Sequence, residues 1–227
     1  MTPSKHTENR NDYQTPALLD YIKNAFAPED SRHHYLLSQM EANNLPQIQI
    51  GATEGKILQC LVHGCHAERA VEIGTLGGYS ALWIADGMPP DGKLYTLEND
   101  PDYALWAAAV FVEIGISEKI SVLAGDANKT LETLTPFGPF DFCFIDADKI
   151  SYPNYLLWAA QNLRPGGVVA LDNAYLFGNV HKNAKTAAEE APAILAMQKI
   201  IGILNDRSFF SSAMMIPTGE GMAVGVK

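Results

Sequence analysis

The sequence predicts an α/β protein with a doubly wound, mostly parallel sheet, an N-terminal helical layer and an antiparallel C-terminal hairpin. Three observations predict this class. Apolar residues recur at helical spacing over residues 15–66. Short apolar runs then alternate with helix-length segments as far as residue 173, which indicates parallel strands covered on both faces. Two final strand-like runs flank the turn TGEG.

The first part of the chain predicts three helices. Their sequences are PALLDYIKNAF, SRHHYLLSQMEAN and TEGKILQCLVHGC, each with apolar residues three and four positions apart. Residues 1–14 are polar and lack the apolar core of a signal peptide, so we expect a flexible tail there. No later stretch resembles a linker, and residues 15–227 are expected to form one domain.

The central part predicts five strands separated by helices. The strands are RAVEIG, KLYTLEND, ISVLAG, FDFCFIDAD and VVALDN. The helices are YSALWIADGM, PDYALWAAAVFVEIG, ANKTLETL and YPNYLLWAAQNL. RPGG, residues 164–167, predicts a turn before the fifth strand. A last helix, with Ile194, Met197, Ile201 and Leu204 at apolar spacing, leads into the hairpin strands FFSSAMMIP and MAVGV.

Composition narrows the possible partners and compartment. The chain has 227 residues, 47% of them hydrophobic, which is enough for one sizeable core. Its formal net charge of −10 repels phosphate backbones and anionic lipids, which argues against nucleic-acid and membrane partners. Three cysteines without a CxxC pair indicate a reduced, cytoplasmic compartment. No apolar run is long enough to span a bilayer.

The segment VEIGTLGGYSALW predicts a ligand-binding turn between the first of these strands and the next helix. Gly74, Gly77 and Gly78 allow a sharp turn and a close approach of ligand to backbone. Any tight turn of this kind favours glycine, so the motif alone has a purely structural alternative. The spacing is not the G-x-G-x-x-G of a diphosphate site, and Glu72 on the strand suits a cationic or amine-bearing ligand instead.

Two further acidic residues follow the next two strands. Glu98 is placed to accept hydrogen bonds from both hydroxyls of a ribose, as carboxylates do in nicotinamide and adenosylmethionine sites. Asp126 can accept from the exocyclic amine of an adenine. Together with Glu72 these residues predict a crevice that suits a positively charged nucleoside.

The fourth and fifth strands end in oxygen-bearing side chains. Asp146 follows the fourth strand, and Asp172 and Asn173 follow the fifth, so we expect the three to converge at one sheet edge. Carboxylate and amide oxygens are ligands for Mg²⁺, Ca²⁺ or Mn²⁺. A vicinal diol could chelate such an ion and lose a proton, for which Lys149 is the candidate acceptor.

Each of these residues also has a structural alternative. Asp148, and less readily Asp146, could cap the helix that starts in SYPNYLL. Lys149 could be a solvated loop amine. Asn173 could simply shape a turn.

Four segments carry a family likeness. EIGTLGGYS, FIDADKISYPNY, LRPGGVVALDN and GEGMAVGVK resemble the cation-dependent, S-adenosylmethionine-using O-methyltransferases, which include catechol and caffeoyl-CoA O-methyltransferases. The resemblance implies a Rossmann-like class I methyltransferase sheet of seven strands with a reversed last strand, and a homodimer. It places the family's metal ligands on Asp146, Asp172 and Asn173 and its general base on Lys149. The implied S-adenosyl-L-methionine contacts are Glu72, Gly74, Ser80, Glu98, Asp126, Ala127 and Asp146.

The resemblance implies methyl transfer to a small catechol-like or hydroxycinnamoyl acceptor, with Mg²⁺ or a similar ion. Where the family often has Leu-Trp-Ser-Gly after the final strand, this chain has Leu176 at the tryptophan position, flanked by Tyr175 and Phe177. Methylation of a modified tRNA base, a nicotinamide-dependent oxidoreductase and a binding protein without catalytic activity are the alternatives.

Overall fold

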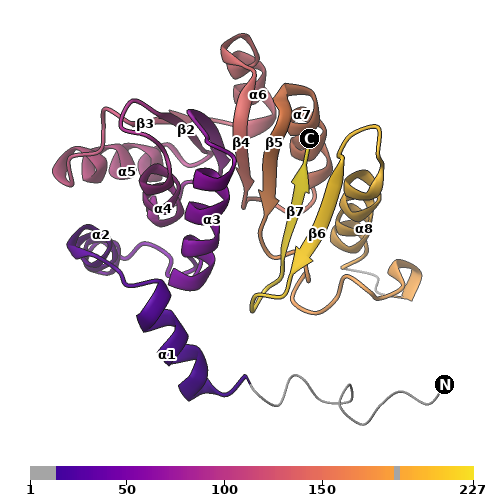
Figure 1. The fold of residues 1–227 in the computed structure, drawn as a ribbon, viewed down its shortest axis with the longest axis horizontal. Coiled ribbons are helices and arrows are strands. Elements are labelled where there is room, and N and C mark those ends of the chain that lie inside the picture. The colour runs from indigo at the N-terminus through magenta and orange to yellow at the C-terminus, as the bar shows by residue number, and fades with distance from the viewer. Residues whose placement is uncertain (1–13, 187–189) are drawn as a thin grey trace.

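The computed structural model describes residues 14–186 and 190–227 of the chain. All but the last residue of the expected tail at 1–14 falls outside these described residues. Figure 1 shows a central sheet with helices on both sides and the N-terminal helix at one end.

Seven strands of the described chain form one sheet, in the order β3-β2-β1-β4-β5-β7-β6. Strands β1 to β5 are parallel, whereas β7 runs antiparallel to both β5 and β6. The predicted mixed sheet with its C-terminal hairpin is therefore confirmed. The strand bounds are β1 Arg69–Ile73, β2 Lys93–Glu98, β3 Ile120–Ala124, β4 Phe140–Ile145, β5 Leu163–Leu171, β6 Ser212–Ile216 and β7 Met222–Val226.

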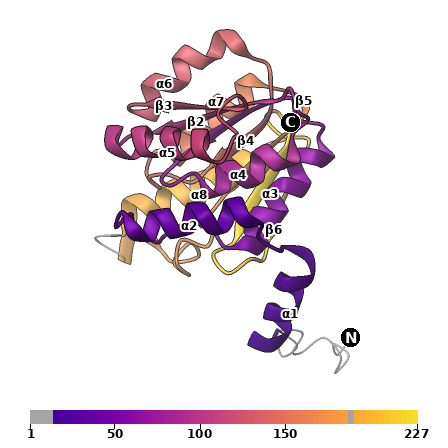
Figure 2. The ribbon, with the colours of Figure 1, turned by 90° about the vertical axis from the view of Figure 1, so that its left-hand side faces the viewer.

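Helices cover the sheet on both faces, as Figures 1 and 2 show. Helices α2 to α5 pack on one face and α6 to α8 on the other. The helix bounds are α1 Pro16–Phe26, α2 Ser31–Ala42, α3 Ala52–Gly64, α4 Tyr79–Gly87, α5 Pro101–Glu113, α6 Ala127–Leu134, α7 Tyr152–Asn162 and α8 Ala191–Asn205, with short 3₁₀ turns η2 Thr135–Phe137 and η3 Ala184–Thr186. Each helix predicted from apolar spacing is present.

Strand β4 shows why the central strands read as continuous apolar runs. Phe142 and Phe144 pack into the core on the α3–α5 side, while Cys143 and Ile145 pack into the core on the α6–α8 side. All four side chains are fully buried. A strand covered on both faces has no polar side to alternate with, so its sequence loses the period of two.

The sequence predicted a turn at residues 164–167, before the fifth strand. This prediction is wrong, because these residues lie within strand β5. Strand β5 begins at Leu163, which pairs with Phe140, and the pairing resumes between Phe142 and Val168. The intervening residues form a bulge, within which Gly166 has a φ of +78°. Glycine with positive φ is used by turns and bulges alike, so the sequence cannot tell them apart.

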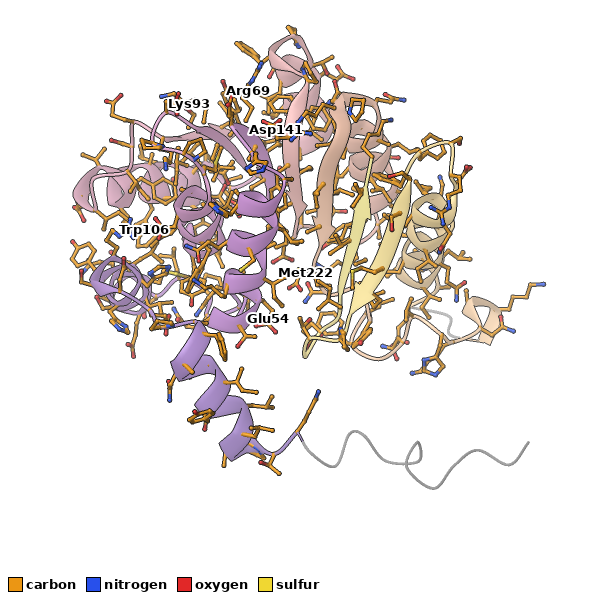
Figure 3. The ribbon with its side chains drawn as sticks, viewed as in Figure 1. Glu54, Arg69, Lys93, Trp106, Asp141 and Met222 are labelled. Carbon is orange, nitrogen blue, oxygen red and sulfur yellow. The ribbon has the colours of Figure 1, made fainter. Side chains whose placement is uncertain are left out.

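An acidic side chain on β4 anchors this bulge. Asp141 accepts a hydrogen bond from Arg164 Nε at 2.6 Å and, through its other oxygen, from the backbone N of Arg69 at 2.8 Å. Figure 3 shows Arg69 and Asp141 at the edge of the sheet where β1 and β4 begin. The network therefore lies at the end of the sheet away from the carboxyl ends of the strands, and serves the fold.

Helix α1 lies at one end of the molecule, away from the sheet (Figures 1 and 2). Its sequence is largely apolar, yet none of its residues is buried. Among the helices of the described residues, none combines the length and the apolar character needed to cross a bilayer.

Candidate active site

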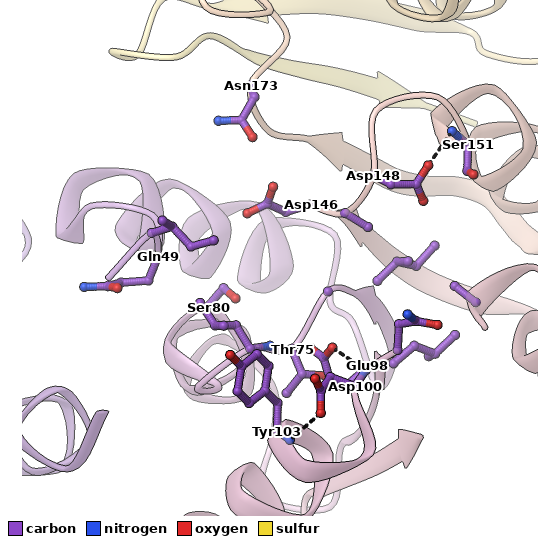
Figure 4. A pocket seen from close by; sticks show the side chains of 18 of the residues that line it. Gln49, Thr75, Ser80, Glu98, Asp100, Tyr103, Asp146, Asp148, Ser151 and Asn173 are labelled. Atoms are coloured by element: carbon purple, nitrogen blue, oxygen red, sulfur yellow. Dashed lines mark hydrogen bonds between the residues drawn. The ribbon is translucent and has the colours of Figure 1, made fainter. Parts of the chain in front are cut away.

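A pocket of about 800 Å³ opens at the carboxyl ends of the parallel strands. One residue at or just after the end of each of the first five strands lines it. Figure 4 shows Glu98, Asp146 and Asn173 among them. These residues are Gly74, Glu98, Asp126, Asp146 and Asn173. Of the strand-end side chains that the sequence singled out, Glu98, Asp126, Asp146 and Asn173 line the pocket, whereas Glu72 and Asp172 do not.

Backbone hydrogen bonds hold neighbouring strand ends in register beyond the last paired residues. The amide of Asp146 donates to the carbonyl of Ile73 at 2.9 Å, and the amide of Asp172 donates to the carbonyl of Ile145 at 3.0 Å. Each bond links a site residue to the strand beside it. The sheet thus sets the positions of both acidic residues.

Gly74 is required by a close approach as well as by its backbone angle. Its φ is +104°, and a Cβ at this position would lie 1.9 Å from the backbone O of Asp146. Gly78, at the start of α4, has a φ of +83°, and its Cβ would meet the ring of Phe111 at 2.3 Å. The structural alternative therefore holds for both glycines, because Gly78 packs on a core ring and Gly74 lets two strand ends touch at the pocket.

Glu72 does not line the pocket. It is fully buried, with Oε1 accepting from Ser80 Oγ at 2.6 Å and Oε2 accepting from Thr96 Oγ1 at 2.5 Å. Burial raises the pKa of this carboxyl to about 8, although both hydroxyls lower it. Ser80 lines the pocket and Glu72 lies behind it. The side chain that faces the crevice is therefore that of Ser80, and not that of Glu72 as expected.

Glu98 is oriented by backbone amides. Its Oε2 accepts from the backbone N of Leu76 at 2.7 Å, and its Oε1 accepts from the backbone N of Asp100 at 2.9 Å. Each carboxylate oxygen can accept a further hydrogen bond. Glu98 can therefore bind two donors of a ligand in the pocket, as the ribose prediction requires.

Asp126 and Ala127 line the pocket where α6 begins. Asp126 is the N-cap of this helix, and its Oδ1 accepts from the backbone N of Asn128 at 3.0 Å. The second oxygen of a capping carboxylate can bind another donor. The adenine contact predicted for these residues stays a prediction.

The two carboxylates of the DADK segment point in different directions. Asp146 lies in the pocket and faces Asn173 (Figure 4). Asp148 turns toward α7, where Oδ1 accepts from the backbone N of Ser151 and Oδ2 accepts from Tyr155 Oη, both at 2.9 Å. Asp148 therefore holds the turn that leads into α7, whose N-cap is Ser151, although it also lines the pocket. Neither carboxylate caps the helix itself.

Lys149 is not a solvated loop amine. Its side chain is 17% exposed. Its Nζ donates to Asp146 Oδ1 at 3.1 Å, to the carbonyl of Ala147 at 3.0 Å and to Tyr152 Oη at 2.6 Å. Since an ammonium has three hydrogens, all of its donors are used. The amine lines the pocket beside Asp146.

Asp172 and Asn173 complete the predicted metal-ligand set. Asp172 is 4% exposed, and its Oδ1 is buried without a hydrogen-bond partner among the described residues. Burial, and then the nearby charge of Asp146, raise the pKa of Asp172 to about 7. Asn173 lines the pocket with a φ of +53°, and its carbonyl accepts from the amide of Leu176 at 2.8 Å, so it also shapes a turn.

These residues fit a hard divalent cation in their chemistry. No three His, Cys, Asp or Glu side chains cluster as a metal site in residues 14–186 and 190–227. The predicted set instead has two carboxylates and the amide oxygen of Asn173, a mixture that suits Mg²⁺. A buried carboxylate oxygen with no hydrogen-bond donor is a group that a cation would satisfy.

A family model described as O-methyltransferase matches residues 28–227. The chain belongs to this O-methyltransferase family. It is 34% identical over 185 residues to a catechol O-methyltransferase of Mycobacterium tuberculosis, covering 82% of each chain. A catechol O-methyltransferase of Niastella koreensis is 31% identical over 212 residues, or 91% of this chain and 94% of that one.

A solved O-methyltransferase from Bacillus cereus, in complex with SAH, has the same fold. The TM-score is 0.83 and the identity 31%, and the match covers 93% of this chain and 97% of that one. The family resemblance and the fold class predicted from the sequence are confirmed. Membership also removes the support for a nicotinamide-dependent oxidoreductase.

Several residues in or directly behind this O-methyltransferase's pocket were missed from the sequence. Thr75 lines the pocket, and its hydroxyl lies 2.6 Å from that of Thr96, which is fully buried. Thr96 could have been found, because it is a polar residue at an inward-facing position of the strand KLYTLE. Tyr152, which binds Lys149, gave no signal beyond a helix start. The linker between α2 and α3 also lines the pocket, through Pro46, Ile48, Gln49 and Ile50.

The charge of the pocket favours a cationic ligand. Five acidic residues line it, namely Glu98, Asp100, Asp126, Asp146 and Asp148. Of the described lining residues, only Lys149 is positively charged. Such a pocket attracts sulfonium, ammonium and metal cations and repels phosphate.

Proposed function

We propose that this chain transfers a methyl group from S-adenosyl-L-methionine to one hydroxyl of a vicinal dihydroxy-aromatic molecule, with the help of a divalent cation. The observation that carries the proposal is that one pocket joins Asp146, Lys149 and Asn173 to the glycine turn and Glu98. The two relatives named catechol O-methyltransferase support this class of acceptor.

The cosubstrate is proposed to occupy the side of the pocket formed by the first three strand ends. Glu98 would bind the ribose, Asp126 and Ala127 the adenine, and Gly74 and Ser80 the methionine end. SAH in the Bacillus cereus relative supports this class of ligand. The acidic lining suits a nucleoside that carries both a sulfonium and an ammonium.

Asp146, Asp172 and Asn173 are proposed to hold Mg²⁺, with Ca²⁺ or Mn²⁺ as alternatives. When bound, the ion would supply a Lewis acid that orients the acceptor's two oxygens and stabilises negative charge on the reacting one. The unpartnered Oδ1 of Asp172 supports this placement.

In the proposed reaction, the acceptor oxygen forms a bond to the methyl carbon as the bond from that carbon to sulfur breaks. The sulfonium leaves as a neutral thioether, and the hydroxyl proton passes to Lys149, whose amine must be in its neutral form to accept it. The pocket provides most of the help by holding oxygen and methyl group in line, which replaces a bimolecular encounter.

Exposed apolar side chains at the pocket support an aromatic acceptor. Ile48 is 76% exposed and Phe177 is 67% exposed, and both line the pocket. A planar ring between them would remove apolar surface from water. With Lys149 as the only cation among the described lining residues, the pocket offers little to a CoA or tRNA phosphate. We therefore favour a small catechol-like or hydroxycinnamoyl acceptor over RNA.

A methyl-transfer screen tests this function. Catechols, hydroxycinnamoyl thioesters and tRNA would each be incubated with S-adenosyl-L-methionine, with Mg²⁺ or with EDTA. We expect turnover of a diol that EDTA abolishes. Asp172→Ala should lose turnover while calorimetry still detects cosubstrate binding. Turnover that EDTA does not change would contradict the proposed metal, and methylation of RNA alone would contradict the proposed acceptor.

A further inference from the structure

The hydroxyl of Tyr152 lies between the amine of Lys149 and the end of β5. Tyr152 is fully buried and does not line the pocket. Its Oη accepts from Lys149 Nζ at 2.6 Å and donates to the backbone O of Asp172 at 3.4 Å. One side chain thus contacts both the candidate base and the strand end that carries two candidate metal ligands.

We propose that Tyr152 is a positioning residue, whose hydroxyl sets the place of the Lys149 amine relative to the end of β5. This inference rests on the proposed function, in which Lys149 accepts the proton of the acceptor. Tyr152 would act through Lys149 and would not itself touch either substrate.

The partners of the amine show why Tyr152 matters for its position. Asp146 and Ala147, which hold two of its hydrogens, both belong to the segment after β4. Among the contacts of the described residues, Tyr152 is the only one that links the amine to Asp172. A lysine side chain has four rotatable bonds, and without the third partner it can move relative to the second strand end.

Tyr152 itself sits on a rigid element. It is the first residue of α7, and Pro153 follows it in the first turn. Asp148 ties the segment before the helix to Ser151 and Tyr155. The phenol is therefore fixed by the helix and the core, and the amine is placed against it.

A hydroxyl also has a property that the other two partners lack. Carboxylate and carbonyl oxygens only accept hydrogen bonds, whereas a hydroxyl can accept or donate. Tyr152 can therefore stay bonded to the amine whether or not the amine carries its third hydrogen.

Tyr152→Phe tests the proposal by removing only the hydroxyl. We expect kcat to fall about 10- to 100-fold, the cost of a misplaced catalytic group. The KM values of both substrates and the affinity for S-adenosyl-L-methionine should change less than about twofold, because Tyr152 does not line the pocket. Tyr35→Phe is the matched control. Its hydroxyl donates to Glu113 Oε2 at 2.7 Å on the outer surface, and its loss should leave kcat unchanged.

A double variant distinguishes positioning from a general loss of structure. Since Tyr152 acts through Lys149, Lys149→Gln with Tyr152→Phe should be no slower than Lys149→Gln alone. Multiplied losses in the double variant, or an unchanged kcat in Tyr152→Phe, would overturn the proposal. Absence of methyl transfer in the wild type would contradict the proposed function instead.

A second readout needs no activity. The rate at which an acylating reagent labels Lys149 in the unliganded protein can be followed by mass spectrometry. We expect Tyr152→Phe to raise this rate roughly fivefold, which corresponds to the net loss of one hydrogen bond. The rate at Lys93, outside the pocket, should not change. Equal labelling of Lys149 in the variant and the wild type would overturn the proposal even if no acceptor is found.

Discussion

Glu72 accepts a hydrogen bond from Ser80 Oγ at 2.6 Å, and it is Ser80 that lines the pocket. A second hydroxyl, that of Thr96, holds the other oxygen of the same carboxyl. Because Glu72 is fully buried, its charged form is penalised by desolvation. The acidic residue of the glycine-turn motif therefore acts on the pocket through Ser80, and its protonation should affect stability.

We expect the free energy of unfolding to fall as the pH rises from 4.5 to about 8. The pKa of Glu72 is raised from 4.5 to about 8, so the folded state keeps a proton that the unfolded state has lost across this range. Stability due to this proton is complete below pH 4.5 and lost by about pH 8, with a slope of up to about 1.4 kcal/mol per pH unit. Urea unfolding at several pH values measures it.

Glu72→Gln is the control for that slope. The amide imitates the protonated carboxyl and does not titrate, so the variant should show a smaller dependence on pH than the wild type. Asp172, whose pKa is also raised, makes the free energy of unfolding fall with pH in both proteins. Its contribution therefore cancels when the two slopes are compared. Equal slopes in the two proteins would show that Glu72 is ionised in the folded state at neutral pH.

Gly74→Ala should destabilise the protein by roughly 2 to 5 kcal/mol. A positive φ costs an L-residue about 1 to 2 kcal/mol, and displacing a packed neighbour costs about 1 to 3 kcal/mol more. The neighbour here is the backbone O of Asp146, 1.9 Å from the added Cβ. Gly115→Ala is the control, because Gly115 also has a positive φ, +74°, but its Cβ would meet no atom of the described residues within 4 Å. Similar losses in urea unfolding for both variants would contradict the close approach.

Asp172→Asn should have opposite effects on the free and the metal-bound protein. At pH 8 the buried carboxyl is mostly ionised, since its pKa is about 7. Removing that charge should leave the unliganded protein equally stable, or more stable by roughly 1 to 3 kcal/mol. Mg²⁺ should stabilise the wild type by about 2.7 kcal/mol at 100 times its Kd, and the variant much less. Thermal unfolding with and without Mg²⁺ measures both effects, and equal stabilisation would rule out Asp172 as a ligand.

We expect the chain to form a homodimer through α1. An isolated helix of 11 residues is marginal in water, and this one exposes Leu18, Leu19, Tyr21, Ile22 and Phe26. An apolar groove of about 390 Å³ lies between α1 and α3. Because one chain carries both the apolar helix and the groove, a two-fold pair could cover both at once.

Light scattering after size-exclusion chromatography checks this expectation. The wild type should have about twice the chain mass of 24.7 kDa, and a Tyr21→Glu, Phe26→Glu double variant about half that value. Leu105→Glu is the control, since Leu105 is 74% exposed on α5, away from the groove. A monomeric wild type, or a dimer that survives the double variant, would refute the α1 interface.

Local patterns were sufficient to predict the order of the elements and several of the polar residues that line the pocket. The apolar runs and glycine turn predicted β1 to β5. The rule that ligands bind where parallel strands end predicted that six side chains would meet at one sheet edge, namely Glu72, Glu98, Asp126, Asp146, Asp172 and Asn173. Of these, Glu98, Asp126, Asp146 and Asn173 line the pocket, whereas Glu72 and Asp172 do not. These features depend on short-range spacing and on one topological rule. The bulge at residues 164–167 escaped prediction because it depends on Asp141, far away in the sequence.

The sequence by itself determined which chemical groups reach the edge of the sheet in this O-methyltransferase. Only the tertiary structure decided which way they face. Asp146 points into the pocket while Asp148 turns to α7, Glu72 lies behind Ser80, and the amine of Lys149 is held by Tyr152. The reason is that a side chain's direction and burial depend on neighbours from other elements, whose packing no local pattern records.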